Sequence, residues 1–329
     1  MKLSFLRIVA FILMLIMLLA SCAPAAVPSE TEDTADEVEL EIYLEREDKE
    51  VKNILMIGNS FCYYYVEELC GIAKADGYEL NVVNLYKSGA RLNEHYESYI
   101  KDEKIGDLYV TNHQQRKRVG TYSFKEALEY AKEKLGGDFD VITLQQSSAY
   151  TRSLNSTQKA KDATLPYARK LYDYIRETHP GVTLYWHQTW AYEIGYDKDA
   201  SNAVTTVEKQ TEMYEAARDL AYVVAKETGV RIVPSGDAWQ IARESEIIGH
   251  DLCRRLEVNN GEGDYYHDGD IGGGQYLNAC VWYEVLMGES CVGNTWRPKN
   301  YTLPEEKIAV IQAAAHEAVA AVYGPGYAQ

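Results

Sequence analysis

Short apolar runs alternate with helical stretches along most of this 329-residue chain. Each run has the length of a buried strand, about four to eight residues, and is bounded by glycine, proline or polar turn residues. The five runs are residues 53–58, 79–86, 140–146, 182–188 and 230–236. Strands that alternate with helices at this spacing predict an α/β fold, with a parallel sheet covered by helices on both faces.

Residues 107–123 interrupt the alternation, because period-two stretches flank a basic turn there and predict a surface hairpin. Downstream, "SFKEALEYAKEKLGG" predicts a helix with a serine cap and a glycine stop. Two late stretches, "GGGQYLNACVWYEVLMG" and "PEEKIAVIQAAAHEAVAAVYG", also predict helices. No linker or internal repeat divides residues 51–329, so we expect them to form one domain.

The first 50 residues predict a targeting signal followed by a tether, rather than folded structure. Lys2 and Arg7 precede a thirteen-residue apolar run that ends in "LASC", which is similar to a bacterial lipobox and predicts lipidation of Cys22. An ordinary secretory signal with an incidental cysteine is the alternative. Residues 23–50 are acidic and poor in apolar anchors, which favours a solvated tether. We therefore expect an extracytoplasmic protein that is held to a bacterial membrane by its lipid alone.

Charge and cysteine content exclude several classes of function. The formal net charge is −17, which repels phosphate backbones and makes nucleic acid an unsuitable partner. Five cysteines remain beyond Cys22, an odd number without CxxC spacing, so neither a disulfide framework nor a zinc site is predicted. The cluster His267, Asp268 and Asp270 lacks the full calcium-loop pattern. We expect no metal and no cofactor.

Polar residues follow several of the predicted strands. In open parallel sheets, ligands bind at the carboxyl ends of the strands. Ser60 follows the first strand, Gly89 the second, Gln145 and Gln146 the third, and His187 ends the fourth. A serine between a strand and a helix is suited to be a nucleophile or a helix cap. His187 lies in an apolar run and is interpreted as a hydrogen-bonded core residue.

Asp264 and His267 supply the other groups that a nucleophilic serine requires. Such a serine needs a base to take its proton and a carboxylate to orient that base. His267 is the only histidine of the chain with an aspartate three positions before it. An aspartate at this spacing can fold back one turn and accept the imidazole N–H.

Taken together, these blocks resemble the SGNH, or GDSL-type, hydrolases. The resemblance rests on Ser60 after the first strand, Gly89 after the second, and Asp264 with His267 near the end. The stretches "ILMIGNSF", "DVITLQQSS", "QTWAY" and "YLNACVWYEVLMG" are similar to an uncharacterised bacterial branch that is often found as lipoproteins. The resemblance implies a three-layer α/β/α sandwich with a five-stranded parallel sheet, and cleavage or transfer of acyl esters, often acetyl groups on carbohydrate.

The resemblance also implies a role for each residue. Ser60 is the nucleophile and an oxyanion donor, and Gly89 supplies a second backbone N–H. His267 acts as base and then acid, and Asp264 fixes its tautomer. The third block of the family normally holds an asparagine after a glycine, and here it reads "LQQSS". Either Gln145 or Gln146 could replace that donor, and Gln145 is favoured because it comes first.

These features favour a serine esterase that removes acyl groups, most often acetyl, from a glycan or another polar acylated molecule. The altered third block leaves an alternative, a lipid-anchored glycan-binding protein that has lost turnover. That alternative predicts a binding role for Tyr63, Tyr64 or Tyr65. Acyl transfer is a third possibility, because an alcohol can replace water in the second step.

Overall fold

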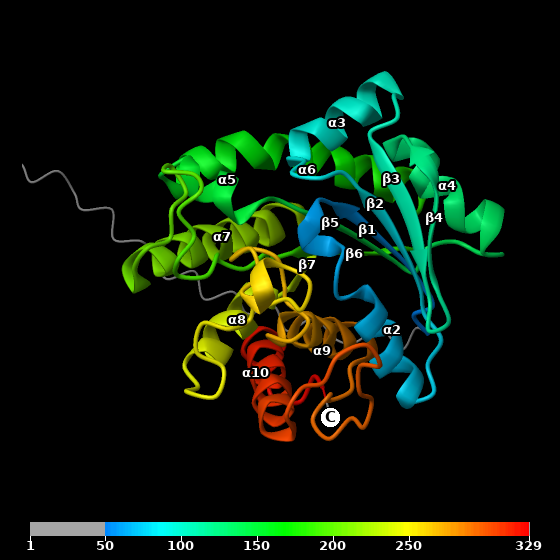
Figure 1. The fold of residues 1–329 in the computed structure, drawn as a ribbon. Coiled ribbons are helices and arrows are strands. Elements are labelled where there is room, and N and C mark those ends of the chain that lie inside the picture. Colours follow the sequence, from blue (N-terminus) through cyan, green and yellow to red (C-terminus); the bar gives the residue numbers. More distant parts are fainter. Residues whose placement is uncertain (1–49, 329) are drawn as a thin grey trace, which may run out of the picture. The chain divides into compact units, whose positions relative to one another are not determined.

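The computed structural model describes residues 50–328, so the predicted signal, the lipidation site Cys22 and almost all of the tether lie outside the described residues. Within that range the strands form a single seven-stranded sheet in the order β4-β3-β2-β1-β5-β6-β7 (Figure 1). The strands are β1 (Asn53–Gly58), β2 (Asn81–Tyr86), β3 (Gly106–Thr111), β4 (Arg116–Tyr122), β5 (Val141–Gln145), β6 (Thr183–His187) and β7 (Arg231–Val233).

The predicted five-stranded sheet is therefore too small. β2, β1, β5, β6 and β7 are parallel, as expected, but the hairpin of β3 and β4 extends the same sheet by antiparallel pairing on β2. The hairpin itself is confirmed. Its docking was not foreseeable from period-two alternation, which indicates a strand without indicating its neighbour.

Helices cover both faces of the sheet, and the α/β prediction is confirmed. They are α2 (Val66–Ala75), α3 (Leu92–Lys101), α4 (Phe124–Lys134), α5 (Ser148–Ser153), α6 (Thr157–Thr178), α7 (Val207–Thr228), α8 (Ser235–Arg243), α9 (Gly274–Met287) and α10 (Glu305–Tyr323). Figure 1 shows α3, α4 and α6 on one side of the sheet and α2, α8, α9 and α10 on the other.

Alternation along the strands divides the core into two layers. Ile54 and Met56 of β1 pack with α2, α8, α9 and α10, whereas Leu55 and Ile57 pack with α4, α6 and part of α7. Successive side chains of a strand point to opposite faces, so a strand buried on both faces is apolar throughout. All six residues of β1 are buried.

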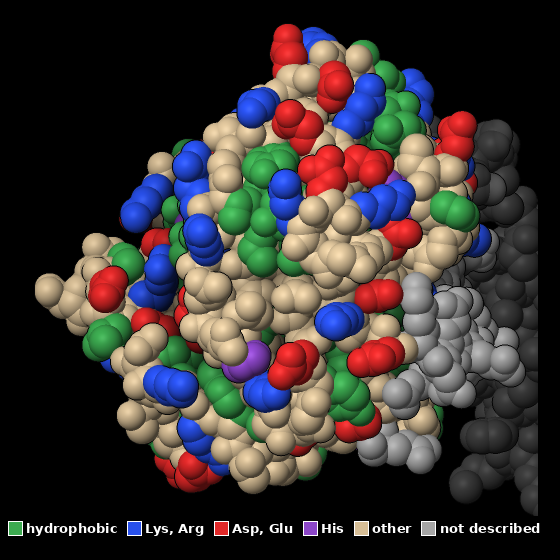
Figure 2. All heavy atoms as spheres, turned by 90° about the vertical axis from the view of Figure 1, so that its right-hand side faces the viewer, with side chains coloured by type: hydrophobic (Ala, Val, Ile, Leu, Met, Phe, Trp, Pro, Cys, Tyr) green, Lys and Arg blue, Asp and Glu red, His purple; other side chains and the backbone are tan. Residues whose placement is uncertain are grey.

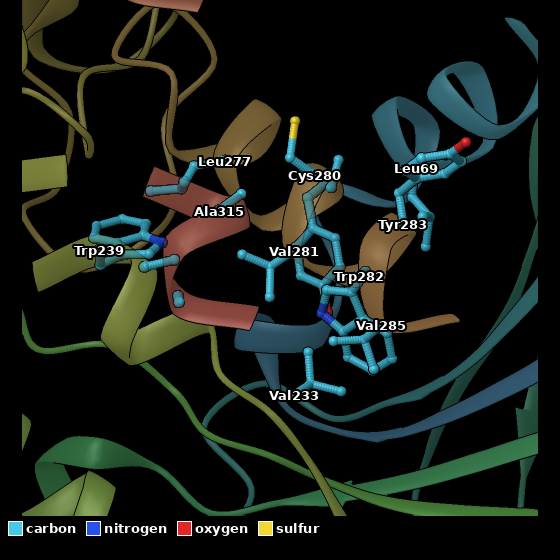
Figure 3. Packing of buried hydrophobic residues seen from close by; sticks show 14 of the residues in the cluster. Leu69, Val233, Trp239, Leu277, Cys280, Val281, Trp282, Tyr283, Val285 and Ala315 are labelled. Carbon is cyan, nitrogen blue, oxygen red and sulfur yellow. The ribbon is translucent and has the colours of Figure 1, made fainter. Parts of the chain in front are cut away.

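α9 is the central helix of one layer, since each of its fourteen residues is buried. Figure 3 shows its labelled side chains between those of Trp239 from α8, Ala315 from α10, Leu69 from α2 and Val233 from β7. A helix that is apolar all round requires partners on every side. The predicted core placement of Trp282 and Tyr283 is confirmed by their full burial.

The end of β1 differs from the expected order, in which Ser60 lies directly between a strand and a helix. A short 3₁₀ turn, η1 (Ser60–Cys62), comes first, and α2 begins only at Val66. Asn59 caps this turn, because its side chain accepts a hydrogen bond from the Phe61 N–H. Ser60 itself is therefore not the capping residue.

Two further features concern the surface and the cysteines. The face shown in Figure 2 has basic and acidic side chains interspersed, without a large region of one sign. None of the helices in residues 50–328 combines the length and apolar character that a bilayer crossing demands. The five cysteines of the described chain are free and buried.

Candidate active site

Asp264 and His267 are joined within one loop, between the 3₁₀ turn η2 (Asn259–Gly261) and α9. His267 Nδ1 lies 2.6 Å from Asp264 Oδ2, and the His267 backbone N–H donates to Asp264 Oδ1 over 2.9 Å. Burial alone would raise the pKa of Asp264, but the hydrogen bond and charge of His267 lower it below its usual value. An ionised carboxylate can only accept, so Nδ1 carries a proton, and in the neutral imidazole Nε2 then presents a lone pair.

The Nε2 atom of His267 is buried and has no hydrogen-bond partner among the described residues, while the whole residue is 9% exposed. Its ring packs against Tyr64 with centroids 4.9 Å apart, and its centroid lies 6.3 Å from that of Phe61. Phe61 follows Ser60 directly in the chain, and Tyr64 lies four positions after it. The fold therefore brings the His267 loop against the segment that carries the serine.

Ser60 opens the 3₁₀ turn at the carboxyl end of β1 and is 7% exposed. Its hydroxyl makes no hydrogen bond within the described part of the chain, and neither does its backbone N–H. The neighbouring Asn59 fixes the turn from three directions. Its Oδ1 accepts from Phe61 N and from Gln145 Nε2, and its Nδ2 donates to the Ala90 carbonyl.

Gly89 lies in the turn after β2. The Ala90 N–H donates to the Lys87 carbonyl over 3.1 Å and closes this turn, with Gly89 at its third position and a φ of +65°. A positive φ at that position favours glycine. The Lys87 N–H donates to the Gly58 carbonyl, which ties the turn to the end of β1. Gly89 is exposed, and its N–H has no acceptor among residues 50–328.

Gln145 and Gln146 point to different neighbours. Gln145 Nε2 donates one N–H to Asn59 over 2.6 Å and keeps a second N–H that has no acceptor in the described range. Gln146 is occupied elsewhere, because its Nε2 contacts Thr164 Oγ1 at 3.4 Å and its Oε1 accepts from Ser147 N. Of the two, only Gln145 lies against the turn that carries Ser60.

A buried ion pair supports the histidine loop and was not anticipated. Glu193 is 1% exposed, lies 3.1 Å from Arg243, and donates its backbone N–H to the Tyr265 carbonyl over 2.7 Å. Trp190 Nε1 donates to the Tyr266 carbonyl over 2.9 Å. Trp190 belongs to the "QTWAY" stretch that carries part of the resemblance, so that motif was the available signal.

Asp268 follows His267 and belongs to the acidic cluster that lacks the full calcium-loop pattern. It is fully buried, and burial raises its pKa to about 8, which the hydrogen bond from Asn278 opposes. Within the described chain no group of three or more His, Cys, Asp or Glu residues is arranged to hold a metal. Burial therefore favours the protonated form of the Asp268 carboxyl, which lies next to His267 in the chain.

His187 lies in the core, as interpreted from the sequence. Its Nε2 lies 3.0 Å from Ser235 Oγ, and burial lowers its pKa to about 3. A histidine that stays neutral and is bonded to a buried serine has a packing role.

Comparison with known protein families assigns most of the chain to one family. A family model described as a domain of unknown function, DUF4886, matches residues 53–318. The chain belongs to the DUF4886 family. A DUF4886 family protein from Bacteroides uniformis has a solved structure with 27% identity and a TM-score of 0.68, covering 85% of this chain and 97% of that chain. No curated protein matches the chain.

Two solved structures of SGNH-type or esterase proteins are more distantly similar to this DUF4886 chain. A proposed SGNH hydrolase from Slackia heliotrinireducens has 18% identity and a TM-score of 0.43, covering 71% of this chain and 98% of that chain. A variant of an acetyl xylan esterase from Geobacillus stearothermophilus has 13% identity and a TM-score of 0.40, covering 72% and 97%. At these identities and TM-scores, neither likeness assigns an activity to this chain.

Proposed function

We propose that this protein is an extracytoplasmic serine esterase that hydrolyses acyl esters, with acetyl groups on carbohydrate as the favoured substrate class. The observation that carries the proposal is the pair of His267 and Asp264, joined over 2.6 Å. The other imidazole nitrogen has no partner among residues 50–328, and the ring lies beside the segment that begins at Ser60. A serine, a base and an orienting carboxylate are the minimum set for acyl transfer through a covalent intermediate.

In the proposed reaction, Ser60 Oγ attacks the ester carbonyl while its proton passes to His267 Nε2. Asp264 stabilises the imidazolium that forms. The tetrahedral intermediate collapses, the C–O bond to the alcohol breaks, and His267 returns the proton to the leaving alkoxide. Water then attacks the acyl-enzyme with the same help from His267, releasing the carboxylic acid and free Ser60.

The oxyanion is held by backbone N–H groups of Ser60 and Gly89 and by the second N–H of Gln145. The absence of acceptors for the two backbone donors within residues 50–328 supports this assignment. So does the hydrogen bond from Gln145 to Asn59, the residue before the nucleophile. Each such donor contributes about 3–4 kcal/mol to transition-state stabilisation in serine hydrolases. Gln146 is assigned no donor role, since its amide is engaged by Thr164 and Ser147.

The location follows from the sequence alone. We propose that Cys22 is lipidated and holds the enzyme at the outside of a bacterial cytoplasmic membrane, where acylated glycans are accessible. Metabolic labelling with an alkyne fatty acid, compared between the native chain and Cys22→Ser, tests this point. Label retained by Cys22→Ser would exclude anchoring at that residue.

The activity is tested by treating the purified protein with a fluorophosphonate and mapping the adduct by peptide mass spectrometry. We expect an adduct on Ser60 that is lost in His267→Ala and retained in His113→Ala, a matched change at an exposed histidine. Ser88, an exposed serine in the Gly89 turn, should remain unlabelled in the same digest. Absence of an adduct from folded protein would instead favour the glycan-binding role.

Labelling is followed by acetate release from peracetylated xylose and N-acetylglucosamine derivatives. We expect release by the native chain and none above background by Ser60→Ala. Equal release by both proteins would exclude Ser60 as the nucleophile.

A further inference from the structure

A cavity lies away from the proposed catalytic residues. It has a volume of about 290 Å³ and lies between α2, the turn joining β3 to β4, and the loop that follows α9. Its lining comprises Glu67, Glu68, Gly71, Asn112, His113, Gln114, Gln115, Arg116, Trp296, Pro298, Lys299, Asn300 and Tyr301. Ser60, Gly89, Asp264 and His267 do not contribute to it. Its volume is near the lower end of small-molecule pockets, about 300–1,000 Å³.

Glu68 lines this cavity and carries an unpaired acceptor. The residue is 7% exposed, and its Oε1 accepts a hydrogen bond from the Tyr301 hydroxyl over 3.0 Å. Its Oε2 is buried and has no partner among the described residues. Burial raises the pKa of Glu68 to about 7, against the lowering effect of Tyr301. A buried carboxyl oxygen without a partner is costly unless a ligand or water bonds to it.

Arg116 also lines the cavity and carries an unpaired donor. Its guanidinium donates to the Tyr63 carbonyl and lies over the Tyr63 ring at 3.5 Å, so its position is fixed. Its Nε is buried and has no acceptor in the described part of the chain. A cation cannot accept from Arg116, and an anion is opposed by Glu67 and Glu68. A hydroxyl group can donate to Glu68 and accept from Arg116.

The remaining lining suits a molecule with several hydroxyls and an apolar face. Trp296 is half-buried and stacks on Tyr276, with ring centroids 6.0 Å apart and planes inclined by 9°. It packs so closely on Gly71 that a Cβ there would lie 2.2 Å from its ring. Gln114, Gln115 and Asn300 add exposed amides. Acidic Glu67 and Glu68 oppose basic Arg116 and Lys299, which favours a neutral ligand.

We propose that this cavity binds one neutral sugar residue, outside the catalytic centre. The proposal rests on the proposed function, in which carbohydrate is the favoured substrate class, and goes beyond it by assigning a separate sugar-binding site. Sugar binding is measured in a variant that lacks the proposed nucleophile. Failure of the binding proposal can therefore be distinguished from failure of the esterase proposal.

The test uses the full chain carrying Ser60→Ala, with methyl glycosides of glucose, galactose, mannose, xylose and N-acetylglucosamine as probes. Saturation-transfer NMR at millimolar concentrations reports binding. We expect transfer to at least one probe, with affinity about tenfold weaker in Glu68→Gln, since one hydrogen-bond acceptor is lost. Gln115→Ala changes an exposed side chain without risk to folding and should weaken binding of the same probe. Gln158→Ala in α6 is the matched control and should leave binding of that probe unchanged.

Three outcomes would overturn the proposal. The first is the absence of saturation transfer from folded protein to every neutral glycoside. Binding equally strong in Glu68→Gln and Gln115→Ala would locate the sugar elsewhere. Cationic glucosamine bound more than tenfold tighter than every neutral probe would identify a cation site. Hydrolysis by the native chain with no sugar binding leaves the esterase proposal intact, and sugar binding without hydrolysis leaves this one intact.

Discussion

Gln145 Nε2 donates a 2.6 Å hydrogen bond to Asn59 Oδ1 and so joins the carboxyl ends of β5 and β1 immediately before Ser60. The same oxygen accepts from Phe61 N, and Asn59 Nδ2 reaches Ala90. Asn59 thus links the serine turn, the Gly89 turn and the third predicted oxyanion element. Three segments far apart in the sequence depend on one buried amide.

Asn59→Asp should impair catalysis more than folding. A carboxylate can accept from Phe61 and Gln145, but it cannot donate to the Ala90 carbonyl, which loses a partner at about 1–3 kcal/mol. We expect a lower melting temperature and slower fluorophosphonate labelling of Ser60. Asn93→Ala, a change at a half-buried asparagine of α3, is the control and should alter neither. An unchanged labelling rate in Asn59→Asp would show that Asn59 does not hold the turn.

Gln145→Ala and Gln146→Ala should differ in kcat. If Gln145 donates to the oxyanion, its loss costs about 10²–10³-fold in kcat, with little effect on KM. Gln146→Ala should cost less than about tenfold, because its amide bonds to Thr164 and Ser147 instead. Steady-state kinetics on an activated acetyl ester decides between them. A larger loss in Gln146→Ala would reverse the assignment.

Asp264→Asn should lower kcat by about 10⁴-fold while the protein stays folded. An asparagine at this position can present its amide N–H to His267 Nδ1 and favour the wrong tautomer. The Asp264 pKa is below its usual value, so its ionisation stabilises the native state at neutral pH, and that stability is lost as the pH falls through the folded pKa. Asp264→Asn should therefore show a weaker decline of stability toward acid than the native protein, measured by urea unfolding.

Asp268 should have the opposite influence on stability. Its pKa is raised from 3.8 to about 8, so the folded state keeps a proton that the unfolded state loses across that window. The free energy of unfolding then falls as pH rises, by at most about 1.4 kcal/mol per pH unit from this group. Asp268→Asn removes the titration and should flatten the dependence between those pH values. A slope identical to that of the native protein would contradict the raised pKa.

Glu193→Gln should destabilise the fold by about 3–5 kcal/mol, because it leaves the Arg243 guanidinium buried without a charged partner. The loop that carries His267 should loosen with it, since the Glu193 backbone holds Tyr265. Asp107→Asn breaks an exposed pair with Arg118 and is the matched control, expected to cost less than about 1 kcal/mol. Urea denaturation measures both, and equal effects would mean that the buried pair contributes no more than a surface one.

The sequence could predict the strands because each is a short apolar run with a clear boundary. The ends of β1 and β5 that carry Ser60 and Gln145 are within one residue of the expected positions. The spacing of Asp264 and His267 likewise indicated the hydrogen bond that they form. Local pattern determines these features, so a single sequence was sufficient.

Other features depend on packing between distant segments. Gln145 and Gln146 are adjacent and chemically identical, and only the position of Asn59 and Thr164 distinguishes them. The docking of the β3–β4 hairpin and the buried pair of Glu193 and Arg243 are likewise tertiary facts. Gly58 illustrates the point, because a Cβ there would lie 2.5 Å from Cγ of Gln145, a residue that follows 87 positions later.

The free, buried cysteines have a practical consequence for handling the protein. Burial raises the pKa of thiols such as Cys62, to about 12, and so keeps them protonated and unreactive at neutral pH. The described chain can therefore be produced in a reducing cytoplasm without an oxidative refolding step. Its five thiols should also be silent toward maleimide in the native state and react together on unfolding, which makes thiol labelling a built-in measure of foldedness for every variant above.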